Sequence, residues 1–227
     1  MSKAFIIIAA VICGLTLTEV IALVRLKLSV ASNDAYWKQR AEEKGELLYV
    51  ALGDSAAQGV GASKPYKSYV GVIADRLAAK TGKSVRVVNL SVSGAKVGDA
   101  LQTQIPKLKK LTPDIVTVEI GANDMQSYDE AAFEASFKEL VSSLPKGSYV
   151  SNMPYFGSRA KQRPNAYSAS SRIETIISTS DARLVNLQSL TQARDSWRGY
   201  AADYFHPNDR AYQNWADAFW REIIKEL

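Results

Sequence analysis

Short β-rich runs alternate with longer amphipathic stretches from Leu47 to the C-terminus, and this alternation constrains the fold more than any other feature. Four of the five β-rich runs consist mainly of Val, Ile and Leu, as expected for strands that are covered on both faces of a parallel sheet. The alternation predicts a three-layer α/β/α sandwich around a five-stranded parallel sheet. The strand candidates are residues 47–53, 85–92, 115–121, 148–154 and 183–190, and the helix candidates are residues 68–82, 97–111, 128–144, 165–180 and 208–227.

Apolar residues in the helix candidates recur at helical spacing. Phe133, Phe137 and Leu140 follow the i, i+4, i+7 pattern of one helix face. Near the C-terminus, large apolar side chains again recur every four residues from Trp215. We expect both sets to pack in the core rather than to bind a ligand.

The first 28 residues differ in character from the rest of the chain. Residues 4–24 (AFIIIAAVICGLTLTEVIALV) form an apolar run that only Glu19 interrupts, and the run is long enough to cross a bilayer. We expect residues 1–28 to be an uncleaved signal anchor or a cleaved signal peptide, with a helix packed on protein as the third alternative. Glu19 would be costly in lipid unless it lies near the interface or has a partner.

The charges after this run leave the orientation open. Several basic residues follow it, which under the positive-inside rule favours a cytoplasmic location for the domain: Arg25, Lys27, Lys38 and Arg40. We nevertheless favour export, with the domain either anchored outside the cytoplasm or secreted after cleavage. Residues 29–46 are expected to be a polar, partly helical connector, and residues 47–227 a single globular domain.

Composition excludes several kinds of site. A single cysteine, Cys13, excludes an intrachain disulfide and a cysteine-rich metal site, and a single histidine, His206, excludes any site with two histidine ligands. The net charge is +5, but the basic residues are scattered, and the one short cluster, Lys107 to Lys110, is typical of a solvated helix end. The sequence therefore predicts neither a metal nor another cofactor, and no nucleic-acid partner.

Polar residues and a glycine follow the predicted strands, where an open parallel sheet binds its ligands. Ser55 follows the first strand, Gly94 the second and Asn123 the third, while Asp203 and His206 precede the last helix. Each motif alone is also typical of an ordinary turn or helix cap. All of them together, in order at strand ends, predict one site.

These residue types match the requirements of nucleophilic acyl transfer. A serine hydroxyl is a weak nucleophile until an imidazole accepts its proton, and the imidazole needs a carboxylate to fix its tautomer. Asp203 and His206 are three residues apart, so one compact loop can hold both. The backbone amides of Ser55 and Gly94 and the Asn123 side chain supply three candidate donors to an oxyanion.

With these residues, the chain resembles the SGNH (GDSL-type) hydrolases, and in particular their lysophospholipase-like and acyl-esterase branch. The similarity extends from Leu47 to the C-terminus and rests on four blocks: GDS at 53–55, NLSVSG at 89–94, GAND at 121–124 and DYFHPN at 203–208. The resemblance implies a flavodoxin-like fold and metal-free hydrolysis of carboxylic esters, with small-molecule or lipid esters as substrates. It implies Ser55 as nucleophile, His206 as base, Asp203 as its orienting acid, and an oxyanion hole formed by the Ser55 amide with Gly94 and Asn123.

Some features of the sequence leave alternatives open. The same residues would serve a deacetylase or acyltransferase acting on cell-envelope glycans, or an inactive, membrane-tethered binding module. Asp54 and Asp124 are expected to hold loops by hydrogen bonds. Glu119 stands where the family usually has an apolar residue, so it is either a polar contact at the strand end, a buried acid with a partner, or an orientation aid near the site.

Overall fold

The computed structural model describes the backbone of residues 3–227 and the side chains of residue 5, residue 14 and residues 16–227. Five parallel strands form one sheet in the order β2-β1-β3-β4-β5, which confirms the predicted α/β fold. Tyr49 pairs with Ile115, and Gly53 pairs with Glu119, so β1 and β3 end together at the same edge. The strands are β1 (Leu47–Gly53), β2 (Val85–Asn89), β3 (Ile115–Glu119), β4 (Tyr149–Ser151) and β5 (Arg183–Val185).

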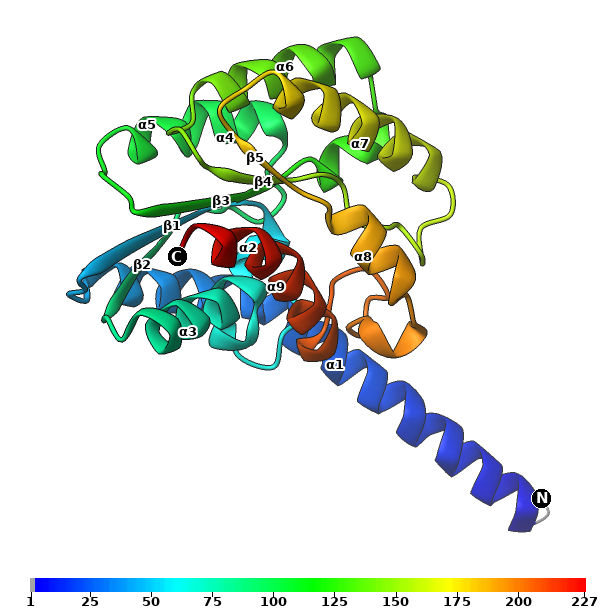
Figure 1. The fold of residues 1–227 in the computed structure, drawn as a ribbon. Helices are drawn as coiled ribbons and strands as arrows, with labels where there is room; N and C mark the ends of the chain where they lie inside the picture. The colour runs from blue at the N-terminus through cyan, green and yellow to red at the C-terminus, as the bar shows by residue number, and fades with distance from the viewer. Residues whose placement is uncertain (1–2) are drawn as a thin grey trace.

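Helices cover both faces of the sheet (Figure 1). One face is covered by α4 (Val97–Thr103), α5 (Ile105–Leu108), α6 (Glu130–Ser142) and α7 (Arg163–Ser178). The other face is covered by the C-terminal part of α1 (Lys3–Glu42), by α2 (Ser55–Gln58), α3 (Tyr69–Thr81), α8 (Leu187–Ala193) and α9 (Asp209–Ile223). Four 3-10 segments complete the chain: Pro65–Lys67, Ala122–Ser127, Trp197–Gly199 and Ile224–Glu226.

Alternate residues of β1 pack into two separate cores. Val50 and Leu52 contact the core beneath α4 to α7, while Tyr49 and Ala51 contact the core beneath α3 and α9. All four side chains are fully buried. A central parallel strand is covered by helices on both faces and therefore has to be apolar on both, as β1 is.

Several predicted elements differ from the structure. The strands β2, β3 and β4 end at Asn89, Glu119 and Ser151, two or three residues before their predicted ends, and two other differences are larger. The predicted strand 183–190 is wrong beyond Val185, because Asn186 accepts a hydrogen bond from the Ser189 amide and thereby caps α8. The predicted helix 97–111 is two helices, α4 and α5, which meet at Gln104. Pro106 lacks the N–H that would continue a single helix, and here it occupies the first turn of α5.

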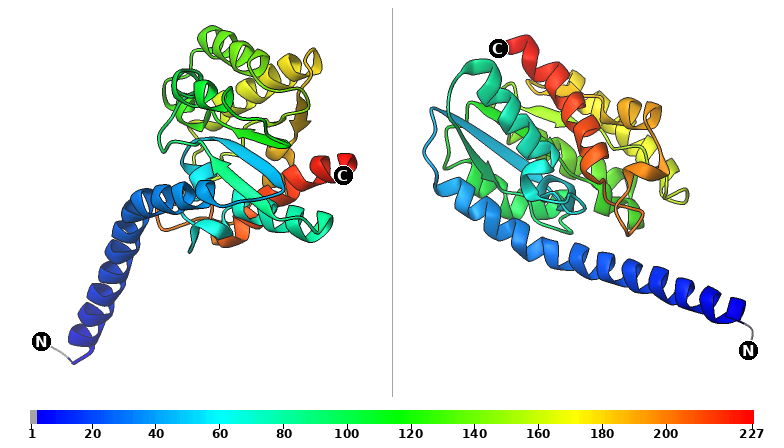
Figure 2. Two further views of the ribbon diagram at one scale, coloured as in Figure 1. Left: turned by 90° about the vertical axis from the view of Figure 1, so that its left-hand side faces the viewer. Right: turned by 90° about the horizontal axis from the view of Figure 1, so that it is seen from below.

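The long first helix has two parts with different surroundings. Its C-terminal part lies against the domain beside β2, with Trp37 buried and its indole N–H donating to the Gln58 carbonyl at 2.9 Å. The N-terminal part extends away from the domain (Figure 2). Within the described residues, no helix is both long and apolar enough to cross a bilayer.

The signal anchor or signal peptide expected over residues 1–28 stays a prediction. Much of the apolar run on which it rested falls on side chains outside the described residues, namely those of residues 1–4, 6–13 and 15. The location of the domain relative to a membrane stays a prediction.

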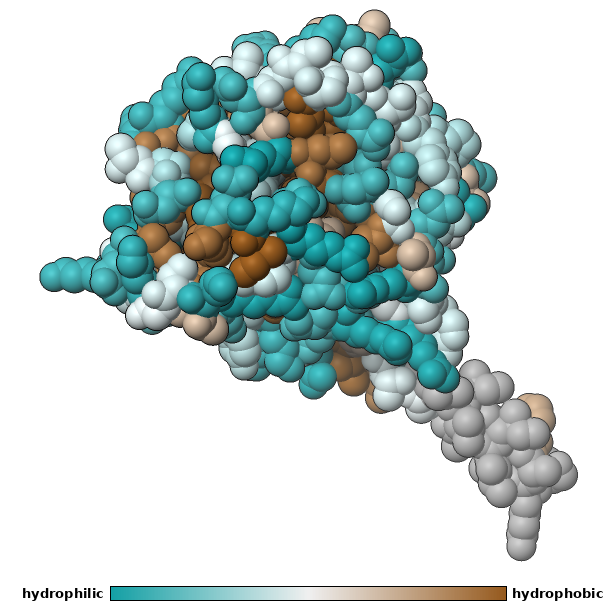
Figure 3. Space-filling view, viewed as in Figure 1, coloured by the Kyte–Doolittle hydropathy of each residue, from teal (hydrophilic) through white to brown (hydrophobic). Residues whose placement is uncertain are grey.

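The surface of the domain is mixed. The face seen in Figure 3 is mostly hydrophilic, with hydrophobic residues visible only in patches between the hydrophilic ones. Large exposed hydrophobic side chains are most frequent along α1, among them Leu17 and Leu28, both more than half exposed. The apolar residues of the domain are thus used mainly in its two cores.

Candidate active site

Ser55 lies at the point where β1 turns into α2. Asp54 is the N-cap of this short helix, and its Oδ1 accepts a hydrogen bond from the Ala56 amide at 2.9 Å. Ser55 is therefore the first residue of α2, where backbone N–H groups have no acceptor within the helix. The residue is buried, with 8% of its surface exposed.

Asp203 and His206 lie in the loop that leads into α9. His206 Nε2 is 2.9 Å from Ser55 Oγ, and His206 Nδ1 is 2.5 Å from Asp203 Oδ2. Asp203 Oδ1 also accepts hydrogen bonds from the Phe205 and His206 amides, both at 3.0 Å. One carboxylate thus orients the imidazole and shapes the turn that carries it.

The electrostatics of this pair favour an ionised Asp203. Burial raises the pKa of Asp203, but the hydrogen bonds and charge of His206 outweigh it and lower the pKa to about 2. Between the two residues, Tyr204 adopts a positive φ of 51° with its side chain exposed. A left-handed tyrosine is uncommon, and it allows Asp203 and His206 to meet within one tight turn.

The loop after α2 approaches the histidine loop closely at Gly61. A Cβ on Gly61 would lie 2.4 Å from the Pro207 carbonyl oxygen and 2.9 Å from His206 Cβ, and its φ is +95°. Only glycine fits here without moving one of the two loops. The small residues that follow Ser55 therefore allow this approach.

The predicted oxyanion donors Gly94 and Asn123 differ in their contacts. Gly94 has a φ of +81° and is exposed, with no atom within 4 Å of the position of a Cβ. The Asn123 amide nitrogen donates to Asp54 Oδ2 at 3.1 Å and to the Ala95 carbonyl at 3.0 Å. Both hydrogens of the Asn123 side-chain amide therefore have acceptors. For Asn123 to donate to an oxyanion, one of these two hydrogen bonds must break or be shared with the oxyanion.

The two motif aspartates hold loops, as the sequence predicted. Asp54 joins the Ser55 turn to Asn123, while Asp124 Oδ2 accepts from the Val97 amide at 3.2 Å. Burial raises the pKa of Asp54 to about 6, although its bond to the Ala56 amide and the charge of His206 oppose the rise. Among the described residues, Glu119 is the other fully buried acid besides Asp54, and burial together with the nearby Asp54 raises its pKa well above its usual range.

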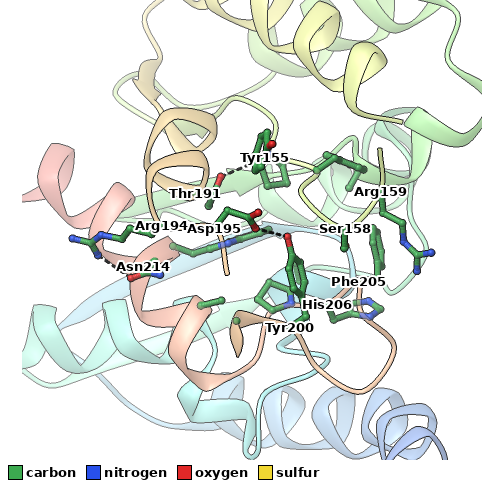
Figure 4. A pocket seen from close by; sticks show the side chains of 18 of the residues that line it. Tyr155, Ser158, Arg159, Thr191, Arg194, Asp195, Tyr200, Phe205, His206 and Asn214 are labelled. Atoms are coloured by element: carbon green, nitrogen blue, oxygen red, sulfur yellow. Dashed lines mark hydrogen bonds between the residues drawn. The ribbon is translucent and has the colours of Figure 1, made fainter. Parts of the chain in front are cut away.

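A cavity of about 520 Å³ opens beside Ser55 and His206. Figure 4 shows Tyr155, Tyr200 and Phe205 around it, with the Tyr200 hydroxyl donating to Asp195 at 2.7 Å. Its lining mixes aromatic, basic and other polar residues, among them five large aromatic side chains and three arginines: Tyr155, Phe156, Tyr200, Phe205, Trp215, Arg159, Arg194 and Arg210. The cavity is large enough for a substrate group of several carbon atoms.

Sequence reasoning missed the cavity wall and one internal support. Most of the wall residues come from loops whose spacing carries no motif, while Arg210 and Trp215 lie on α9. Trp215, which the sequence predicted to pack in the core, does so and also lines the cavity. Gln104 is fully buried, accepts from the Gly53 amide at 2.9 Å and donates to the Gly53 carbonyl at 2.8 Å. It therefore fixes the end of β1 directly before Ser55, and the only available signal was a glutamine in an otherwise apolar helix face.

The structure thus brings all of the predicted site residues to the carboxyl edge of the sheet. A serine, a histidine and an aspartate in hydrogen-bonded series on this fold define the class of serine hydrolases. Within the described residues, no group of three or more His, Cys, Asp or Glu is placed to hold a metal ion.

The chain belongs to the GDSL-like Lipase/Acylhydrolase family, whose sequence model matches residues 51–213. The protein is accordingly a carboxylic ester hydrolase of the GDSL, or SGNH, type. Among curated relatives, it is 27% identical over 226 residues to the uncharacterized protein YpmR of Bacillus subtilis, covering 83% of this chain and 87% of that protein. It is 33% identical over 104 residues to an arylesterase of Vibrio mimicus, covering 45% of this chain and 50% of that enzyme.

Solved structures share the fold. An acetylxylan esterase of Geobacillus stearothermophilus superposes with a TM-score of 0.65 at 22% identity, over 78% of this chain and 94% of that one. A lipase from a goat rumen metagenome superposes with a TM-score of 0.62 at 18% identity, over 78% and 97% of the two chains. At this level of identity the likeness extends to the fold alone.

Proposed function

We propose that this esterase cleaves acyl-ester or lysophospholipid-type substrates through a Ser55–His206–Asp203 triad and an acyl-enzyme intermediate. The observation that carries the proposal is the unbroken series of contacts from Ser55 Oγ through the imidazole to Asp203, at 2.9 Å and 2.5 Å. These distances are those at which a nucleophile and its base exchange a proton.

The proposed reaction has two steps. In the first, Ser55 Oγ attacks the ester carbonyl, its proton moves to His206 Nε2, and the same proton then goes to the departing alcohol oxygen. In the second, a water gives a proton to His206 and attacks the acyl-enzyme, which releases the acid and returns the proton to Ser55. Asp203 holds the imidazole in the tautomer that accepts at Nε2 and stabilises the imidazolium.

The proposed oxyanion hole consists of three donors around Ser55. In this proposal the Ser55 and Gly94 amides and the Asn123 side chain donate to the oxygen that becomes negative in the tetrahedral intermediate. Asn123 supplies its bond by loosening its contact with the Ala95 carbonyl, so that its contact with Asp54 keeps the side chain in place.

The cavity supports a substrate larger than an acetate ester. The five large aromatic side chains in its lining offer apolar contact to an organic group, and its volume of about 520 Å³ accommodates an acyl chain or a bulky alcohol. Deacetylation of, or acyl transfer to, a cell-envelope glycan is the second candidate. It is favoured by the structural likeness to acetylxylan esterases, which are enzymes that act on an acetylated glycan.

A panel of p-nitrophenyl esters and acetylated oligosaccharides tests the proposal. We expect turnover of p-nitrophenyl esters by the wild type and none above background by Ser55→Ala, with both proteins giving the same circular dichroism spectrum. A preference for acetylated oligosaccharides over every acyl chain longer than acetyl would favour the second candidate. Equal turnover by wild type and Ser55→Ala would show that the nucleophile is assigned wrongly.

A further inference from the structure

Two arginines of the catalytic cavity have no carboxylate partner within the described residues. Arg159 lies in the loop after β4, and Arg210 lies in the first turn of α9. Both line the cavity that opens beside Ser55 and His206, and both are exposed, so an entering substrate can reach them. Neither takes part in an ion pair of the described chain.

Arg159 is held next to the loop that carries the catalytic histidine, as Figure 4 shows. Its guanidinium carbon lies 5.1 Å from the centroid of the Phe205 ring, and that ring lies 5.0 Å from the imidazole of His206. One of its terminal nitrogens also donates to the Asp203 carbonyl at 3.4 Å. These contacts use one face and one nitrogen of the guanidinium, which leaves its other N–H donors available to a ligand.

The loop that carries Arg159 is fixed from inside the protein. Arg163 Nε donates to the Phe156 carbonyl at 3.1 Å, and its Nη2 donates to the Gly157 carbonyl at 2.6 Å. Phe156 also packs against Phe205, with the ring centroids 6.4 Å apart. Because these contacts order the loop without a substrate, less conformational freedom is lost when a substrate binds.

Helix stability does not account for Arg210. A cation in the first turn of a helix lies at the positive end of the helix dipole, where it is unfavourable. The neighbouring Asp209 does not offset this charge, because its carboxylate accepts from the Ser63 hydroxyl at 2.7 Å and pairs with Lys67 at 3.0 Å. Arg210 belongs instead to the face of α9 that lines the cavity, with Ala211, Asn214 and Trp215.

The exposed charge around the cavity is predominantly positive. The third arginine of the lining, Arg194, pairs with Asp217 at 2.7 Å, but Asp217 also pairs with Arg76 at 2.8 Å. Asp195 contributes an exposed carboxylate to the lining, where its Oδ1 accepts from the Tyr200 hydroxyl at 2.7 Å. The described lining thus has more guanidinium groups than exposed carboxylates, which favours an anion over a cation.

The remaining acids of the lining are buried. Asp54 accepts hydrogen bonds from the Ala56 amide and the Asn123 side chain. Glu119 is fully buried, and its carboxyl oxygens have no hydrogen-bond partner among the described residues. Neither acid pairs with Arg159 or Arg210, so neither competes with an anionic substrate for them.

We propose that Arg159 and Arg210 are specificity-determining residues that bind an anionic group, a carboxylate or a phosphate, on the part of the ester that enters the cavity. Guanidinium groups donate paired N–H groups to the oxygens of both anions. The preferred substrates are therefore esters whose acyl or alcohol part carries a negative charge. This inference rests on the proposed esterase function and specifies its substrate class.

Matched pairs of esters test the proposal on the full-length chain. In the carboxylate pair, mono-p-nitrophenyl adipate is compared with p-nitrophenyl hexanoate. In the phosphate pair, 1-butanoylglycerol 3-phosphate is compared with 1-butanoylglycerol. We expect kcat/KM to be about tenfold higher for the anionic member of at least one pair at low salt. This ratio should fall as NaCl is raised from about 20 mM to about 500 mM, because the arginines are exposed.

Substitutions of the two arginines test the assignment. Arg159→Gln and Arg210→Gln should each lower the ratio of anionic to neutral kcat/KM by about threefold, and the double substitution should abolish the preference. Arg198→Gln is the matched control, because it removes the same charge from a nearby loop. The Arg198 guanidinium lies over Trp197, and the residue does not line the catalytic cavity. This control should leave both ratios unchanged.

Butanoylcholine and its neutral analogue 3,3-dimethylbutyl butanoate test the opposite charge. A preference for butanoylcholine stronger than that for the anionic esters would overturn the inference, because Asp195 would then set the charge selectivity. Equal kcat/KM within both anionic pairs, or a preference that persists in the double substitution, would also overturn it and leave the esterase function intact. Failure of the wild type to hydrolyse any of these esters would contradict the proposed function itself.

Discussion

Asp203→Asn is the substitution whose effect the site geometry specifies most closely. The asparagine carbonyl can still accept the Phe205 and His206 amides, which Asp203 Oδ1 accepts at 3.0 Å, so the turn is retained. The asparagine NH₂ would then face His206 Nδ1, where the carboxylate oxygen now lies at 2.5 Å. A donor at that position forces Nδ1 to accept, which places the imidazole proton on Nε2.

The expected kinetic loss is large. With a proton on Nε2, His206 cannot accept the Ser55 proton, and loss of the correct tautomer in serine triads lowers kcat by about 10⁴. This factor corresponds to about 5.5 kcal/mol of transition-state stabilisation. The KM should change little, because Asp203 faces the imidazole rather than the substrate cavity.

The expected loss of stability is much smaller. Lowering the Asp203 pKa from 3.8 to about 2 corresponds to roughly 2 kcal/mol for the ionised group, and partial exposure of the side chain reduces this to about 1 kcal/mol. Because the folded-state pKa is lowered, the contribution is complete above the unfolded value of about 4. It is lost as the pH falls through about 2.

The assay combines kcat and KM for p-nitrophenyl acetate at pH 7 with urea unfolding at pH 7 and pH 3. Asp203→Asn should be folded, with a kcat about 10⁴-fold lower than wild type and an unchanged KM. Its free energy of unfolding should be lower than that of the wild type at pH 7, and this difference should be smaller at pH 3. A variant that keeps more than a tenth of wild-type kcat would refute the assignment of Asp203 as the orienting acid.

Three further substitutions test separate contacts. Asn123→Ala should lower kcat for p-nitrophenyl acetate by about 10² to 10³ in a protein that still folds, with a lower melting temperature because Asp54 and the Ala95 carbonyl lose a donor; an unchanged kcat would remove Asn123 from the oxyanion hole. Gly61→Ala should lower both kcat and the free energy of unfolding, because the added Cβ would clash with the Pro207 carbonyl and with His206; a wild-type kcat would contradict this. Gln104→Leu should cost about 2 kcal/mol in urea unfolding by leaving the Gly53 amide without its acceptor, and a midpoint equal to wild type would be inconsistent with that role.

The layered fold was predictable because the strand signals are local. β1 is a continuous buried run, and its bounds agree with the sequence prediction at both ends. β5 was predicted too long because Leu187 and Leu190 continue the apolar pattern. In the structure these two residues belong to α8, whose N-cap is Asn186. A capping hydrogen bond of one side chain outweighed an ambiguous run of hydrophobic residues.

The site was predictable in its residues but not in its contacts. The expectation that ligand sites follow the carboxyl ends of strands selected Ser55 and Asn123. His206 precedes the last helix instead, and it was selected because a serine nucleophile needs an imidazole. Both hydrogens of the Asn123 side-chain amide have acceptors, and one of these acceptors is the Ala95 carbonyl, which no sequence pattern indicates. The lack of a protein partner for Glu119 likewise depends on side chains from distant elements, so only three-dimensional packing could reveal it.

Labelling by a fluorophosphonate tests the central claim most directly, because the probe reacts with a serine only where a base activates it. The wild type should take up one probe per chain, and mass spectrometry of the digested protein should place it on Ser55. His206→Ala should label far more slowly, and Ser55→Ala should not label. A folded wild-type protein that hydrolyses esters without labelling at Ser55 would contradict the account.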